Sequence, residues 1–180
     1  MSFHPSTCKK RAIRLARTVL LPLALYGTTF APALALSCLP QDVARVYEQA
    51  ASSEDTYIVV HGTLTFDETR LPKTDWQNQQ KKPPDTLIPA RLKGKALTKR
   101  GFNAGFNQPI TFNVQCLGPW CASAKSGTPY LAFLRKTDSD YHLNINACGG
   151  MGFAEPSEQA LETVVQCFRG GPCKPQHLRR

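Results

Sequence analysis

The chain has 180 residues, of which 22 are Lys or Arg and 13 are Asp or Glu, and its net charge is +9. Five of the basic residues and none of the acidic ones lie within residues 1–17, which leaves 17 basic residues and a net charge of +4 in the rest. Much of the basic excess is thus confined to one end, and nucleic-acid binding is not expected from it.

The first segment has the order of an export signal. A basic stretch leads into the apolar residues 18–35, which end in two small residues at the spacing of a cleavage site. Proline and glycine interrupt this apolar stretch, which is already short for crossing a bilayer. We expect residues 1–35 to be a signal peptide removed after Ala35, with cleavage after Ser37 and lipid attachment to Cys38 as alternatives.

The remaining residues, 36–180, are numerous enough for one domain with its own core, and they contain no second hydrophobic span. An exported protein of this kind belongs in the periplasm or outside the cell. Export also makes nucleic acid an improbable partner for the mature chain.

Hydrophobic periodicity predicts a helix, a group of strands and a second helix. Helical spacing covers 39–51 and 155–168, whereas alternation of apolar and polar residues indicates strands at 56–66, 87–100, 110–117, 128–136 and 141–148. Residues 67–86 lack periodicity and predict a long loop, and the glycines and asparagines of 101–109 predict a turn-rich connector. Strands grouped together favour a mainly β (α+β) fold, an antiparallel sheet or small barrel.

Six cysteines remain beyond the signal, and an even number in an exported chain predicts three disulfides. Sequence does not select one connectivity, but short separations favour Cys116 with Cys121 and Cys167 with Cys173, which leaves Cys38 with Cys148. A metal site is not expected, because the first of these pairs lacks the two-residue spacing of a zinc knuckle and no paired histidine follows.

Several short segments together resemble the netrin-like modules and the N-terminal domain of tissue inhibitors of metalloproteinases. They are a cysteine before a helix, the strand VVHGTLTF, the run CASAKSGTPYLAFL, the strand YHLNINAC and a terminal helix carrying Cys167. The resemblance spans about residues 38–173 and implies a five-stranded oligonucleotide/oligosaccharide-binding (OB) barrel whose disulfides tie the N-terminus to late strands.

The resemblance also implies a specific alternative function. Inhibitory members of the family chelate the protease zinc with the free amine and carbonyl of an N-terminal cysteine, a position that Cys38 would take if cleavage follows Ser37. This chain departs from those inhibitors at Pro40, where they carry a second cysteine, and proline removes a backbone donor there. Metalloprotease inhibition is therefore an alternative and not the main expectation.

No catalytic motif or cofactor motif stands out, so we expect a non-enzymatic binding module without a cofactor. His61 and His142 fall on strand faces that the pattern predicts to be exposed, and a periplasmic enzyme of unknown type stays an alternative because triads are set by geometry. The best binding candidates are a basic stripe at strand period followed by further cations and two aromatics: Arg91, Lys93, Lys95, Lys99, Arg100, Phe102 and Phe106.

On an exported protein, a basic stripe of this kind suits an acidic glycan, a lipid headgroup or a protein as the ligand. The competing interpretation is an edge strand whose lysines protect it against aggregation.

Overall fold

The structure is a computed structural model that describes residues 36–73 and 83–175. The expected signal peptide lies outside the described residues, as does the middle of the expected loop, residues 74–82. No helix in the described part of the chain is long and apolar enough to cross a membrane.

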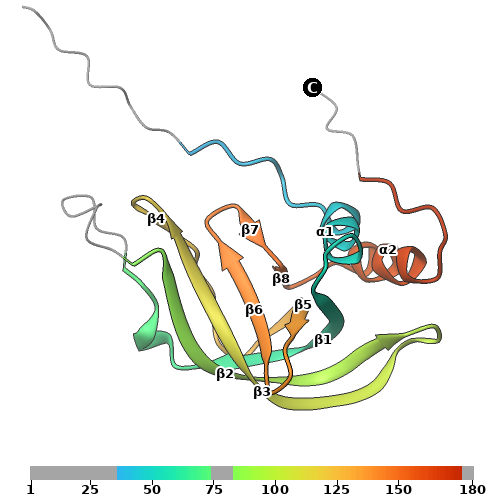
Figure 1. The fold of residues 1–180 in the computed structure, drawn as a ribbon, viewed down its shortest axis with the longest axis horizontal. Helices are drawn as coiled ribbons and strands as arrows, with labels where there is room; N and C mark the ends of the chain where they lie inside the picture. Colours follow the sequence, from blue (N-terminus) through green and yellow to red (C-terminus); the bar gives the residue numbers. More distant parts are fainter. Residues whose placement is uncertain (1–35, 74–82, 176–180) are drawn as a thin grey trace, which may run out of the picture. The chain divides into compact units, whose positions relative to one another are not determined.

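The elements follow the expected order of helix, strands and helix (Figure 1). They are α1 (Val43–Ala51), β1 (Thr56–Phe66), the short 3-10 helix η1 (Glu68–Arg70), β2 (Asp85–Thr98), β3 (Gly101–Leu117), β4 (Trp120–Cys121), β5 (Thr128–Lys136), β6 (Tyr141–Asn146), β7 (Gly149–Gly150), β8 (Gly152–Ala154) and α2 (Glu158–Phe168).

Five strands close into a ring, in the order β1, β2, β3, β6, β5 and back to β1. The mainly β fold class with an OB-like barrel and flanking helices is thus confirmed. One pairing departs from the expected antiparallel arrangement, because β3 and β6 run parallel. Strand directions cannot alternate all the way around a ring with an odd number of members, so one parallel pair is required.

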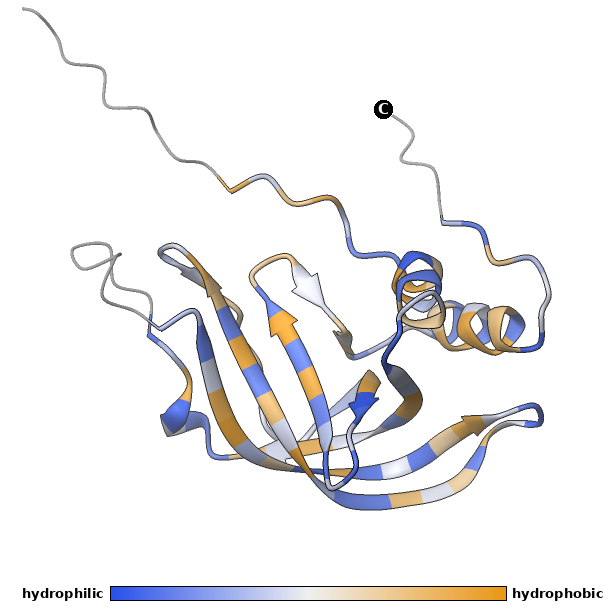
Figure 2. Cartoon of the chain, viewed as in Figure 1, coloured by the Kyte–Doolittle hydropathy of each residue, from blue (hydrophilic) through white to orange (hydrophobic). Residues whose placement is uncertain are grey.

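The core has two layers, one inside the ring and one under the helices. Alternate side chains of each strand point into the barrel, where Leu64, Leu92 and Phe112 are fully buried, and the alternation is visible as bands along β2, β3 and β6 in Figure 2. The opposite face of β1 and β5, which includes Val59 and Phe133, packs against residues of α1 and α2. The expected alternation in β1 is confirmed, but its second face is only partly exposed.

Each helix begins at a capping side chain. Asp42 accepts a hydrogen bond from the backbone of Arg45 at 2.9 Å, so α1 begins at Val43 and not at residue 39 as expected. Ser157 caps α2 in the same way, through the backbone N–H of Ala160.

The expected connector at 101–109 is wrong, because these residues form the first half of β3. They pair with β2 in an antiparallel hairpin that turns at Lys99 and Arg100, where the Thr98 hydroxyl accepts from the Arg100 backbone. Gly105 lies opposite Lys95, with nothing within 4 Å of the position of a Cβ. The outer side of the strand has free space at this position, so glycine and asparagine are tolerated in it. The abundance of turn-forming residues in 101–109 was therefore a misleading signal.

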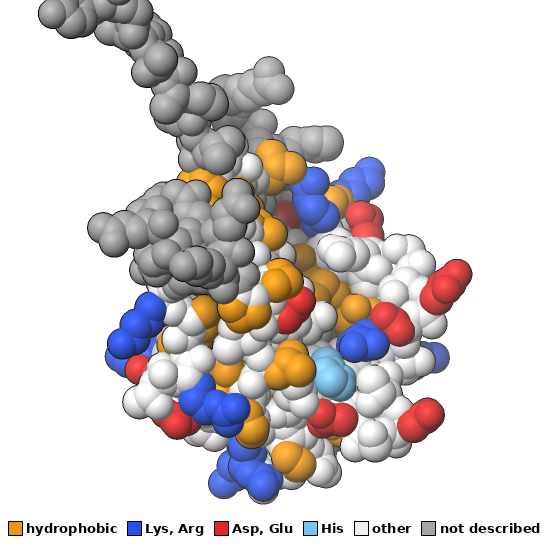
Figure 3. Space-filling view, turned by 60° about the vertical axis from the view of Figure 1, so that its left-hand side comes forward, with side chains coloured by type: hydrophobic (Ala, Val, Ile, Leu, Met, Phe, Trp, Pro, Cys, Tyr) orange, Lys and Arg blue, Asp and Glu red, His pale blue; other side chains and the backbone are white. Residues whose placement is uncertain are grey.

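Three disulfides have the pairing that the short separations favoured: Cys38–Cys148, Cys116–Cys121 and Cys167–Cys173. The first joins the segment before α1 to the end of β6. Large hydrophobic side chains stay exposed at Leu39 and Leu87, and Figure 3 shows one face on which hydrophobic side chains lie among charged side chains of both signs.

Candidate functional site

Arg91, Lys93 and Lys95 lie together on the outer face of β2, which we call the basic face. All three are exposed, whereas Leu92 between them is fully buried in the barrel. The strand period explains this, because side chains two residues apart share a face. The predicted stripe is therefore present on the surface.

In the described part of the chain, the register neighbours of the basic face on β1 and β3 carry no carboxylate. Register places Thr65, Thr63 and His61 of β1 beside the three cations on one side, and Pro109, Asn107 and Gly105 of β3 on the other. Among the described residues the salt bridges join Arg135 to Asp55 and His142 to Asp140, so neither involves the basic face. The Arg91 guanidinium donates to the Asn107 side chain at 3.3 Å, which orients it along the sheet.

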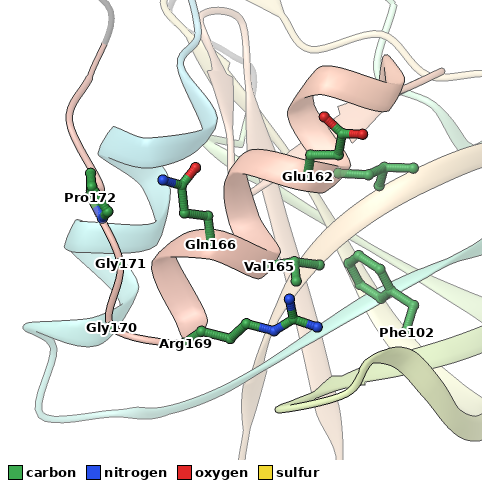
Figure 4. Close-up of a pocket in the computed structure, with 9 residues that line it drawn as sticks. Phe102, Glu162, Val165, Gln166, Arg169, Gly170, Gly171 and Pro172 are labelled. Carbon is green, nitrogen blue, oxygen red and sulfur yellow. The ribbon is translucent and has the colours of Figure 1, made fainter.

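Lys99 and Arg100 are exposed at the hairpin turn, beyond the basic face. The Arg169 side chain donates to the Lys99 carbonyl at 3.0 Å and ties this turn to the C-terminal end of α2. Phe102 packs edge-on against His61 and lines a cavity of about 640 Å³ with the last turns of α2. In Figure 4 the Phe102 ring and the Arg169 guanidinium point toward one another across this cavity.

Phe106 does not join the other candidates. Its side chain is buried and packs edge-on against Tyr141, with ring centroids 5.3 Å apart. It lies opposite Gly94 in the β2–β3 register and belongs to the buried hydrophobic core. Phe106 is thus a core residue and is not available on the surface as a ligand contact.

Among the described residues, His142 does not form a hydrogen-bonded nucleophile–base pair with its neighbour Thr111. His142 lies 3.7 Å from the Asp140 carboxylate, but Thr111 donates its hydroxyl to that same carboxylate and not to the imidazole. A nucleophile–base pair requires the hydroxyl to bond to the imidazole. Asp140 also accepts from the backbone of Tyr141 and so fixes the turn between β5 and β6. The described residues contain no group of three or more side chains suited to a metal ion.

The sequence did not indicate a second hollow, which we call the amide groove. It has a volume of about 340 Å³ and lies between the segment before α1 and strands β3 and β6. Its principal polar lining residues are Arg45, Gln49, Tyr57, Gln115, Asn144 and Asn146.

Two features hold the outer wall of the amide groove in place. The disulfide at Cys38 fixes one end, and the Gln41 amide donates to the carbonyls of Gly150 and Gly152 at 3.0 Å each. Gly149 has φ +112°, which favours glycine, and a Cβ there would lie 2.5 Å from the end of the Gln41 side chain and would displace that amide.

Comparisons with protein-family models, with curated proteins and with solved structures find no match to this chain. The resemblance to netrin-like modules therefore stays a prediction.

Proposed function

We propose that the protein is an exported, non-catalytic binding module that holds an anionic ligand on the basic face of β2. The observation that carries this proposal is the row of three exposed cations on one strand, which have no carboxylate among their described register neighbours on β1 and β3. Unpaired like charges at this spacing repel each other unless counter-ions or a ligand neutralise them. The three disulfides support export to an oxidising compartment, periplasmic or extracellular.

The topology argues against the edge-protection interpretation of these cations. Residues Ala90–Ala96 of β2 pair with β1 on one side and with β3 on the other, so this part of β2 is not an edge strand. Lysines that protect an edge would lie on a strand with unpaired backbone groups. The cations of the basic face lie in the middle of a paired sheet, where they do not serve that purpose.

The ligand that fits best is an acidic glycan. Side chains two residues apart on a strand stand about 7 Å apart, which suits a chain with regularly repeated anionic groups. The neighbouring Thr63 and Asn107 side chains offer hydrogen bonds to sugar hydroxyls beside the charges. An acidic protein or a lipid headgroup would use the cations without needing these flanking groups.

The test is a binding measurement with heparin as a soluble polyanionic glycan. The variant R91E/K93E/K95E reverses the basic face, and the matched control R70E/K125E/K136E makes the same charge change at exposed residues elsewhere. We expect heparin affinity to fall by about tenfold or more in the first variant and far less in the control.

Three results would count against the proposal. Equal losses in the two variants would show that net charge alone governs binding. If the unaltered protein did not bind heparin, an acidic glycan would be excluded as the ligand. Binding to phosphatidylglycerol vesicles without binding to heparin would replace the glycan by a lipid headgroup.

A further inference from the structure

A carboxylate next to the amide groove orients two amides, of which Gln115 lines the groove. Asp85 accepts hydrogen bonds from the side-chain amides of Asn113 at 2.7 Å and Gln115 at 2.8 Å. Both donate to the same oxygen, so both carbonyl oxygens are turned away from Asp85. Among the described residues, the buried Asn113 oxygen has no donor, although Asn113 itself does not line the groove. The Gln115 side chain does line it, and in the same part of the chain its oxygen accepts no hydrogen bond.

Further amides in the groove also have unused hydrogen-bonding capacity. Asn144 lies opposite Asn113 in the β3–β6 register, and in the described part of the chain its side chain has no hydrogen bond. Asn146 accepts from the Cys148 backbone at 2.8 Å, which leaves its NH2 group available to the groove. The groove thus presents free donors and free acceptors side by side.

A hydroxyl-rich ligand matches this set of groups. Each hydroxyl both donates and accepts, so neighbouring hydroxyls of one sugar ring can satisfy a mixed row of amide donors and acceptors. The charged lining residues, Arg45 and Asp42, have opposite signs, so the groove does not select for charge. Tyr57 and the exposed Leu39 at its edge provide apolar surface for the C–H face of a ring.

An extended peptide fits less well. A peptide that adds to a sheet needs a strand with unpaired backbone groups. The strand beneath the groove, β6, pairs with β3 on one side and with β5 and β7 on the other, and the Asn144 carbonyl accepts from the Met151 backbone. Recognition in the groove must therefore come from side chains.

From these observations we propose that the amide groove binds an uncharged sugar unit through its hydroxyl groups, with Gln115, Asn144 and Asn146 as the principal contacts. This site is separate from the basic face of β2 and does not depend on the function proposed for it.

The test is calorimetric titration of the full mature protein with three uncharged oligosaccharides: cellotetraose, maltotetraose and chitotetraose. We expect at least one to bind and its affinity to fall by about tenfold in Asn144→Ala and in Gln115→Ala. Gln108→Ala is the matched control, because Gln108 is an exposed amide on the same strand, β3, outside the groove, and this variant should bind as the unaltered protein does. The basic-face variant R91E/K93E/K95E should also bind the sugar normally.

Failure of all three sugars to bind would overturn the proposal, as would equal affinity in Asn144→Ala and the unaltered protein. Binding of tetraglycine with loss in the same two variants would assign the groove to a peptide instead. Asn144→Ala removes a half-buried side chain without a hydrogen bond, so its folding should be preserved, and circular dichroism checks this.

Discussion

Removal of the disulfide between Cys38 and Cys148 should destabilise the protein more than removal of either short disulfide. The two cysteines are 110 residues apart, against 5 for Cys116 and Cys121. On the chain-entropy model the long cross-link contributes about 5 kcal/mol and the short one about 2 kcal/mol, because a longer loop restricts the unfolded chain more. Cys116 is buried, and its loss adds a packing cost of about 1 kcal/mol.

The assay is urea unfolding followed by far-ultraviolet circular dichroism, with C38A/C148A compared with C116A/C121A. We expect the free energy of unfolding to fall by about 5 kcal/mol in the first variant and about 3 kcal/mol in the second. A loss in C38A/C148A no larger than that in C116A/C121A would refute the reasoning. It would mean that the segment before α1 is not tied to β6 by this bond in solution.

Two further substitutions test the barrel, and a third tests the carboxylate that orients the amides. Gly94→Ala places a Cβ 2.1 Å from the His61 carbonyl oxygen and should cost about 2 kcal/mol in urea unfolding, whereas an unchanged midpoint would contradict the strand contact. Phe106→Ala should cost about 3 kcal/mol by the same method because the ring is buried against Tyr141, and a surface ring would cost little. Hydrogen bonds from two amides lower the pKa of Asp85 below 3.8, so its contribution to stability is full above that pH and is lost as pH falls through the lowered value. Asp85→Asn should therefore lose less stability than the unaltered protein between about pH 5 and about pH 2 in acid titrations, and identical curves would contradict this.

The sequence predicted those parts of the fold that depend on local periodicity. The period-two pattern located five of the strands, and the spacing of the cysteines favoured the pairing that the structure has. It failed at 101–109, where the residues satisfy their backbone groups by pairing with β2 across the hairpin. Turn propensity is a local property, and tertiary pairing overrode it.

The same distinction between local pattern and tertiary pairing separates the two candidate sites. The basic face lies on one strand, so alternation alone placed Arg91, Lys93 and Lys95 together. The amide groove combines side chains from α1, β3 and β6, which the parallel pairing of β3 with β6 brings together. The alternating polar residues of YHLNIN were the available signal, but without the register they did not indicate which strand would lie beside them.

The most direct test of the proposed function is an NMR titration of the ¹⁵N-labelled mature protein with a heparin tetrasaccharide. We predict saturable shifts at the backbone amides of Arg91, Lys93 and Lys95 and at their register neighbours on β1 and β3, with the amide groove unaffected. Absence of shifts, or shifts confined to residues away from β2, would contradict the assignment of the anionic ligand to the basic face.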